Sequence, residues 1–204
     1  DRRQIVCLAR HVGELGRSNS LDVADNSRLD VGKDLFVGNG NSRTNAWFNR
    51  LTVGAGGTVA VGWTAYVGGS GCSNELTVAA GGSLSATNAL TVGVYASATG
   101  NVFRLAGGTA YTPGAFTVGD FGSFNRAVID GGQLTCGAFY VGKSAGSVGN
   151  ELVLEGGTLL AAAIPFVGYN GSDHSMTVCD AGCFSTTQRF GVGQGGSVNA
   201  RLNI

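Results

Sequence analysis

A glycine loop that recurs about every 25 residues constrains the fold of this chain more than any other feature. A loop that opens with Val-Gly begins at residues 12, 37, 67, 92, 118, 141, 167 and 192. Each loop is followed by a short alternating run such as RLTV at 50–53, a tight turn such as AGG, a second run, and a third run that enters the next loop. Repeats of this length are typical of solenoids, because one repeat buries its apolar face only against its neighbours.

The three runs of each repeat have the alternation of β-strands, and no window shows an apolar stripe with helical spacing. The 36 glycines lack a Gly-X-Y period, which excludes a collagen helix, and the 43% of hydrophobic residues suffice for a core. We therefore predict an all-β fold in which residues 1–204 form a single domain. This domain is a parallel β-solenoid of about eight coils, with three short strands in each.

A polar residue closes each loop, and these residues form one predicted column. Stacked amide side chains can hydrogen-bond from coil to coil and satisfy buried backbone groups. The loop VGQGGSVN at 192–199 is therefore interpreted as a corner, because a phosphate loop would need a helix after it. The predicted ladder consists of Asn19, Asn49, Asn74, Asn101, Asn125, Asn150, His174 and Asn199.

This repeat pattern resembles the right-handed parallel β-helix proteins, whose asparagine ladders have this role. Within that group it is most similar to the glycine-rich repeats of bacterial autotransporter passenger domains and related surface adhesins. The resemblance covers the whole chain and depends on the repeat, not on a unique motif. It implies right-handed winding and an extracellular or cell-surface location, and it transfers no catalytic residue.

Charge and motif content disfavour several function classes. The formal net charge is zero and 13% of residues are charged, so we expect no nucleic-acid partner. No apolar run approaches the ~20 residues of a membrane-spanning helix, and we expect no membrane insertion. His11 and His174 lie about seven coils apart, and no column is expected to hold two neighbouring acids beside a basic residue. We therefore predict no metal, no cofactor and no enzymatic activity.

The cysteine count is odd, at five, so at least one thiol has no partner within the chain. Cys179 and Cys183 flank the corner DAG at 180–182. Their separation around a tight turn is compatible with a disulfide, and equally with two small corner residues.

An outward column of aromatic residues precedes the Val-Gly pairs. It includes Phe36, Tyr66, Tyr140 and Phe166. Three interpretations are open: lateral contact with another chain, stacking on sugar rings, and the ordinary preference of aromatic residues for strands.

The two ends of the chain have matching phases in the repeat. DRRQIVCLARHVG at 1–13 aligns with DGGQLTCGAFYVG at 130–142, and RLNI at the end corresponds to ELVL at 151–154. We expect a whole number of coils without a polar C-terminal cap, and head-to-tail assembly of rods as one outcome. The alternative is that the chain is a segment of a longer repeat protein. The predicted assembly interface comprises Asp1, Arg2, Arg3, Ile5, Arg10, Arg201, Leu202 and Ile204.

The sequence thus predicts a structural role, as the subunit of an extracellular filament or as the stalk of an adhesin. The partner would be a second copy or neighbouring coils of the same protein. The alternative function is carbohydrate binding through the aromatic column, and a polysaccharide-degrading enzyme is the less favoured third possibility.

Overall fold

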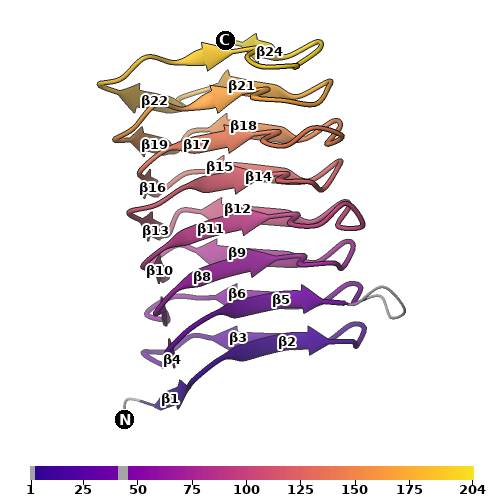
Figure 1. Cartoon of the computed structure of the whole chain (residues 1–204). Helices are drawn as coiled ribbons and strands as arrows, with labels where there is room; N and C mark the ends of the chain where they lie inside the picture. Colours follow the sequence, from indigo (N-terminus) through magenta and orange to yellow (C-terminus); the bar gives the residue numbers. More distant parts are fainter. Residues whose placement is uncertain (1–2, 41–45) are drawn as a thin grey trace.

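The computed structural model describes residues 3–40 and 46–204, which wind into stacked coils (Figure 1). Its strands form three parallel sheets of eight strands each, so the chain is a β-solenoid of about eight turns. The described residues contain no helix, and consequently none long and apolar enough to cross a membrane. Asp1 and Arg2 of the predicted interface lie outside the described residues.

Each coil contributes its first strand to one sheet, which we call the β1 sheet. In stacking order it contains β1 (Gln4–Cys7), β4 (Arg28–Val31), β7 (Thr58–Val61), β10 (Ser83–Ala86), β13 (Thr109–Thr112), β16 (Gln133–Cys136), β19 (Thr158–Ala161) and β22 (Cys183–Thr186).

The β2 sheet holds the strands that lead into the Val-Gly loops. These are β2 (Arg10–Glu14), β5 (Leu35–Asn39), β8 (Thr64–Val67), β11 (Ala89–Val92), β14 (Phe116–Val118), β17 (Phe139–Val141), β20 (Phe166–Val167) and β23 (Gly191–Val192).

The β3 sheet holds the strands that follow the Val-Gly loops. These are β3 (Ser20–Val23), β6 (Arg50–Val53), β9 (Glu75–Ala79), β12 (Val102–Ala106), β15 (Arg126–Asp130), β18 (Glu151–Glu155), β21 (Ser175–Cys179) and β24 (Arg201–Asn203).

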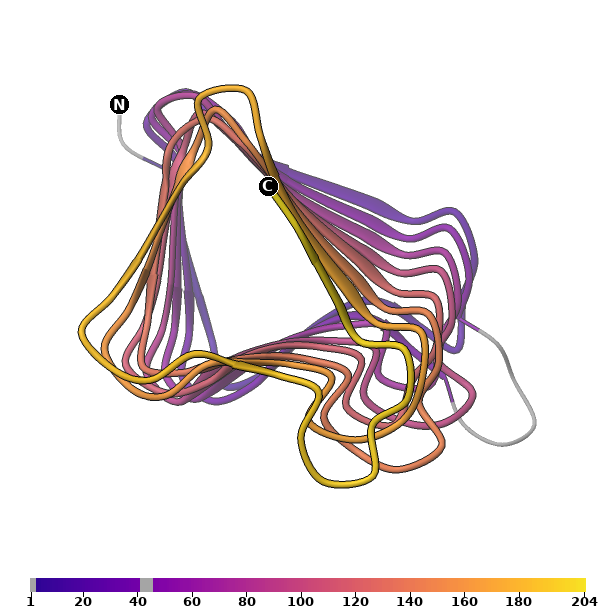
Figure 2. The same ribbon diagram turned by 90° about the horizontal axis from the view of Figure 1, so that it is seen from above.

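Seen from above, the coils enclose a triangle, and the Val-Gly loops project from one of its corners (Figure 2). Alternation along each strand directs every second side chain into this triangle. In β9, for example, Leu76 and Val78 are buried and their neighbours are partly exposed. The parallel register aligns equivalent apolar residues between coils, so the core is one continuous column of Val, Leu and Phe.

The glycine that follows valine at the start of each Val-Gly loop has a positive φ, and in most coils it also faces a ladder side chain of the next coil. Gly93 has φ of 75°, in the left-handed region that side chains disfavour. A Cβ atom on Gly93 would lie 2.1 Å from Nδ2 of Asn125 in the next coil. The repeated Val-Gly is therefore a consequence of the ladder that passes beside it.

Candidate functional site

The asparagine column forms a directional hydrogen-bonded ladder through the projecting corner. Nδ2 of Asn49 donates to Oδ1 of Asn74 at 2.9 Å, and the backbone N–H of Asn49 donates to the same oxygen at 3.0 Å. The pattern repeats from Asn74 to Asn101 and from Asn101 to Asn125. Every bond between two ladder side chains runs from one coil to the next in chain order, so each amide oxygen from Asn49 onward receives its protons from the preceding coil.

The side-chain amides of the ladder asparagines from Asn49 to Asn150 also bond to the Val-Gly loop of the preceding coil. The second hydrogen on Nδ2 of Asn74 is donated to the carbonyl oxygen of Ala46 at 2.9 Å, and Asn150 donates likewise to Gly122. Both side chains are fully buried. Because buried amides whose donors and acceptors are satisfied stabilise the fold, these groups have a structural role and offer no free atom to a ligand.

His174 replaces asparagine in the seventh coil and is fully buried. Its Nδ1 accepts the backbone N–H of Asn150 at 3.1 Å, and its Nε2 lies 3.3 Å from Oγ of Ser147. Because Oγ of Ser147 donates to the carbonyl of Ser144, it must accept a proton from Nε2. Burial lowers the pKa of His174, in agreement with a neutral ring protonated at Nε2.

The predicted place of Asn199 in the ladder is wrong. The backbone N–H of Arg201 bonds to the carbonyl of His174, and Arg201 pairs with Ser175, so Ala200 is the residue that follows His174 in the column. Asn199 lies one place earlier with φ of 55°, and its amide donates to Asp173 at the surface. The last loop is one residue longer than its neighbour, and the strand register, not the loop length, sets the ladder position.

The aromatic column is arranged as two stacks separated by threonines. The rings of Phe36 and Tyr66 are nearly parallel, with centroids 4.8 Å apart, and His11 meets Phe36 edge-on at 4.9 Å. Tyr140 stacks on Phe166 at 5.9 Å. These side chains are half-buried, and burial raises the pKa of Tyr66.

This stacking determines what the aromatic column can bind. A sugar ring binds to the flat face of an aromatic side chain, and here each ring turns a face to its neighbour in the next coil. Solvent meets mainly the ring edges. The geometry therefore indicates that the aromatic column stabilises the β2 sheet and is poorly suited to bind a sugar ring.

The disulfide considered between Cys179 and Cys183 is not formed, and all five cysteines are free thiols. Cys179 ends β21 in the β3 sheet and Cys183 begins β22 in the β1 sheet. Both alternate with inward residues, so they point outward from two faces of the triangle that diverge at the corner. Side chains that point apart do not meet disulfide geometry. The Cys136 thiol is buried, which raises its pKa to about 12.

Two acidic side chains lie next to each other in neighbouring coils. Asp130 and Glu155 pair in adjacent strands of the β3 sheet, and Arg104 forms an ion pair with Asp130. The expectation that no column holds neighbouring acids beside a basic residue is thus wrong, because the corner residues continue the β3 sheet. Within residues 3–40 and 46–204, no group of three His, Cys, Asp or Glu side chains is placed to hold a metal ion.

The described residues of the predicted assembly interface lie at the two ends of the rod. Ile5 is exposed on β1, while Arg10 occupies the inward column in register with Leu35. At the other end, Leu202 is partly buried and Ile204 is 97% exposed. The remaining residues, Arg3 and Arg201, are exposed.

A hollow of about 410 Å³ lies on the open face of the last coil. Apolar side chains that would be covered in any inner coil line most of it. They are Val178, Phe184, Phe190, Leu202 and Ile204.

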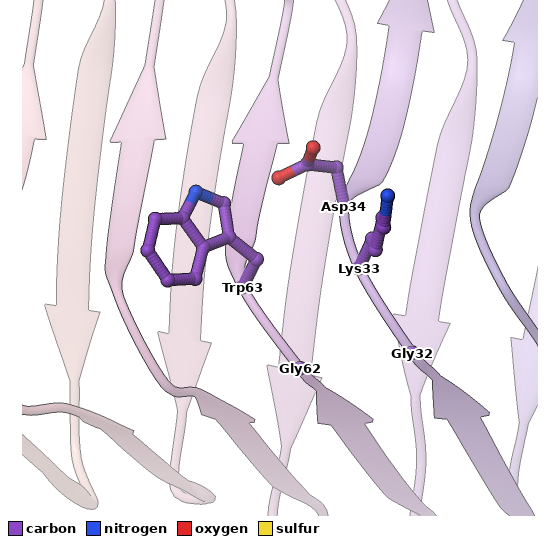
Figure 3. Close-up of a pocket in the computed structure, with 5 residues that line it drawn as sticks. All are labelled: Gly32, Lys33, Asp34, Gly62 and Trp63. Atoms are coloured by element: carbon purple, nitrogen blue, oxygen red, sulfur yellow. The ribbon is translucent and has the colours of Figure 1, made fainter.

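A second hollow, which the sequence did not predict, lies at the corner between the β1 and β2 sheets. Lys33 and Asp34 connect β4 to β5, and Trp63 connects β7 to β8 one coil later (Figure 3). The signal in the sequence is the correspondence of VGKD at 31–34 with VGWT at 61–64, which places a large side chain after each glycine.

Comparison of the chain with protein-family models, with curated proteins and with solved structures found no match.

Proposed function

We propose that this chain is a structural β-solenoid that works outside the cell or at its surface, as the rod of a filament or the stalk of an adhesin. The observation that carries the proposal is the apolar hollow on the last coil, where Phe184, Phe190 and Leu202 lack the cover that inner coils have. Burial of apolar area against another coil would be favourable at about 25 cal/mol per Å². A second copy or a neighbouring coil of a longer protein would supply that cover.

The polarity of the ladder supports stacking in one direction. In the described part of the chain, no donor is recorded for Oδ1 of Asn19, the first ladder residue. Ala200 occupies the last ladder position and has no side-chain amide. A rod whose first coil stacks on the last coil of another would place Oδ1 of Asn19 where the N–H of Ala200 can donate. Such a contact is heterologous and propagates into a filament.

The test is negative-stain electron microscopy of the purified chain with light scattering. A filament role predicts long fibres, and L202D should reduce their length because it places a charge on the apolar face. The matched control is Y111D, since Tyr111 is 53% exposed on the side of the rod. Monodisperse short rods would overturn the filament and leave the stalk, in which flanking coils cover the face.

Carbohydrate binding through the aromatic column is the weaker proposal, because Phe36 and Tyr66 cover each other's faces. F36A and Y66A would abolish such binding while the fold remains. No observation in the described residues favours polysaccharide cleavage over a structural role: Asp130, beside Glu155, is already paired with Arg104.

A further inference from the structure

The corner hollow formed by Gly32, Lys33, Asp34, Gly62 and Trp63 has a volume of about 320 Å³. It lies on the side of the rod, and its lining residues belong to the second and third coils and not to either end coil. It is therefore independent of the assembly proposed above.

Trp63 offers a flat apolar surface that the aromatic column lacks. Its side chain is 55% exposed. In the described part of the chain no aromatic ring stacks on it, in contrast to Phe36 and Tyr66. An indole exposed to this extent lacks much of the stabilisation that a tryptophan side chain normally gains from burial.

Two charged groups lie beside this surface. The carboxylate of Asp34 turns toward the indole, and Lys33 stands on the other side of that carboxylate (Figure 3). Oδ1 of Asp34 accepts the backbone N–H of Thr64 at 3.2 Å, which orients the carboxylate. Within residues 3–40 and 46–204, neither Lys33 nor Asp34 forms an ion pair.

A flat apolar face beside one acceptor and one donor matches a pyranose ring. Sugars with equatorial hydroxyls carry C–H groups on both ring faces and hydroxyls around the rim, so the face can pack on the indole. The rim can then donate to Asp34 and accept from Lys33. The two charges balance, which favours a neutral ligand, and the carboxylate would repel the phosphates of a nucleic acid.

We propose that Trp63, Asp34 and Lys33 form a binding site for one pyranose unit of a neutral oligosaccharide with equatorial ring hydroxyls. Trp63 is the platform, Asp34 accepts hydrogen bonds from ring hydroxyls, and Lys33 donates one. The stacked residues Phe36 and Tyr66 do not take part.

The experiment is a titration of the ¹⁵N-labelled protein with cellohexaose, followed through the indole N–H signals of its two tryptophans. The W63A spectrum assigns the signals. We expect the Trp63 signal to shift with a Kd on the order of 1 mM while the Trp47 signal stays in place. D34N, which keeps the platform, should weaken binding by about tenfold, as expected for the loss of ~1.4 kcal/mol.

Matched variants separate this site from other surfaces. Y111A removes an exposed aromatic side chain from the β1 sheet and Y140A disrupts the second stack of the aromatic column, and both should bind as the parent chain does. A Trp63 signal that stays unchanged up to about 10 mM cellohexaose would overturn the site. Tighter binding of hexagalacturonate than of cellohexaose would overturn the neutral ligand, and loss of binding in Y140A would move the site to the column.

Discussion

At the scale of single residues, a ladder asparagine of one coil packs directly against the Val-Gly glycine of the neighbouring coil. Gly93 leaves the space that Asn125 occupies, and Asn125 in turn donates to the carbonyl of Ala98 and to Asn150. An asparagine without the facing glycine would have no room. The repetition of both residues at one spacing is therefore a packing constraint.

G93A is predicted to destabilise the fold strongly, because it adds a Cβ that meets Asn125 at 2.1 Å as well as left-handed backbone strain of about 1–3 kcal/mol. Gly156 is the matched control: its φ is 70° and no atom lies within 4 Å of an added Cβ. Urea unfolding should show a larger loss of unfolding free energy for G93A than for G156A. Equal losses would mean that the contact between Gly93 and Asn125 contributes nothing to the free energy of unfolding.

His174 is predicted to make stability pH-dependent. Its pKa in the folded chain lies below the ordinary value of 6.5, so the unfolded chain binds the proton more readily. The stabilisation is complete above pH 6.5 and is lost as the pH falls toward the lowered pKa. As the pH falls across this range, the midpoint temperature of thermal unfolding should decline more steeply for the parent chain than for H174N, which retains an acceptor for Asn150. Parallel curves would contradict the prediction.

At the scale of elements, the aromatic column couples neighbouring strands of the β2 sheet. Phe36 on β5 and Tyr66 on β8 are cross-strand partners as well as stacked rings. Tyr140 and Phe166 repeat the arrangement on β17 and β20. Thr91 and Thr117 separate the two stacks, and both are buried.

F36A and Y66A are predicted to be non-additive. A double-mutant cycle on the free energy of unfolding should give a coupling of about 0.5–1.5 kcal/mol, the range for stacked rings. The control cycle combines F36A with F166A, which lie in different stacks and should be additive within ~0.5 kcal/mol. Additivity in the first cycle would show that the rings stabilise the sheet only individually.

At the scale of the whole molecule, stability is distributed along the rod by nearest-neighbour contacts. The largest fully buried side chains, Phe103, Phe116 and Phe139, lie in the middle coils. Toward the C-terminal end, β20 and β23 shorten to two residues and Val192 becomes exposed. Solenoids of this kind open from weakly covered coils, because each coil is stabilised only by its neighbours.

Amide hydrogen exchange should therefore be slowest in β12, β14 and β15 and fastest in β1 and β22–β24. Mass spectrometry of peptides from deuterated protein would measure this gradient. If the chain forms filaments, the end coils should become protected under assembly conditions, while β12 and β15 keep their rates. Uniform exchange along the chain would contradict nearest-neighbour stability.

The amino-acid sequence alone was sufficient for the fold. The period of about 25 residues and the three alternating runs predict three stacked parallel sheets, because strand alternation and the need of each coil for a neighbour are local constraints. The same reasoning placed the ladder from Asn19 to His174. These features depend only on residues that keep their spacing from one coil to the next.

The tertiary structure decided whatever depends on register across coils and on side-chain direction. Ala200, not Asn199, continues the ladder because hydrogen bonding of β24 to β21 sets the position and the loop absorbs the extra residue. Asp130 lies beside Glu155 because the β3 sheet continues into that corner. The Cys179 and Cys183 side chains point apart because they belong to two sheets that diverge at their corner. Trp63 lies beside Asp34, 29 positions earlier in the chain, for the same reason: coils bring together residues one period apart, and loop lengths determine which ones.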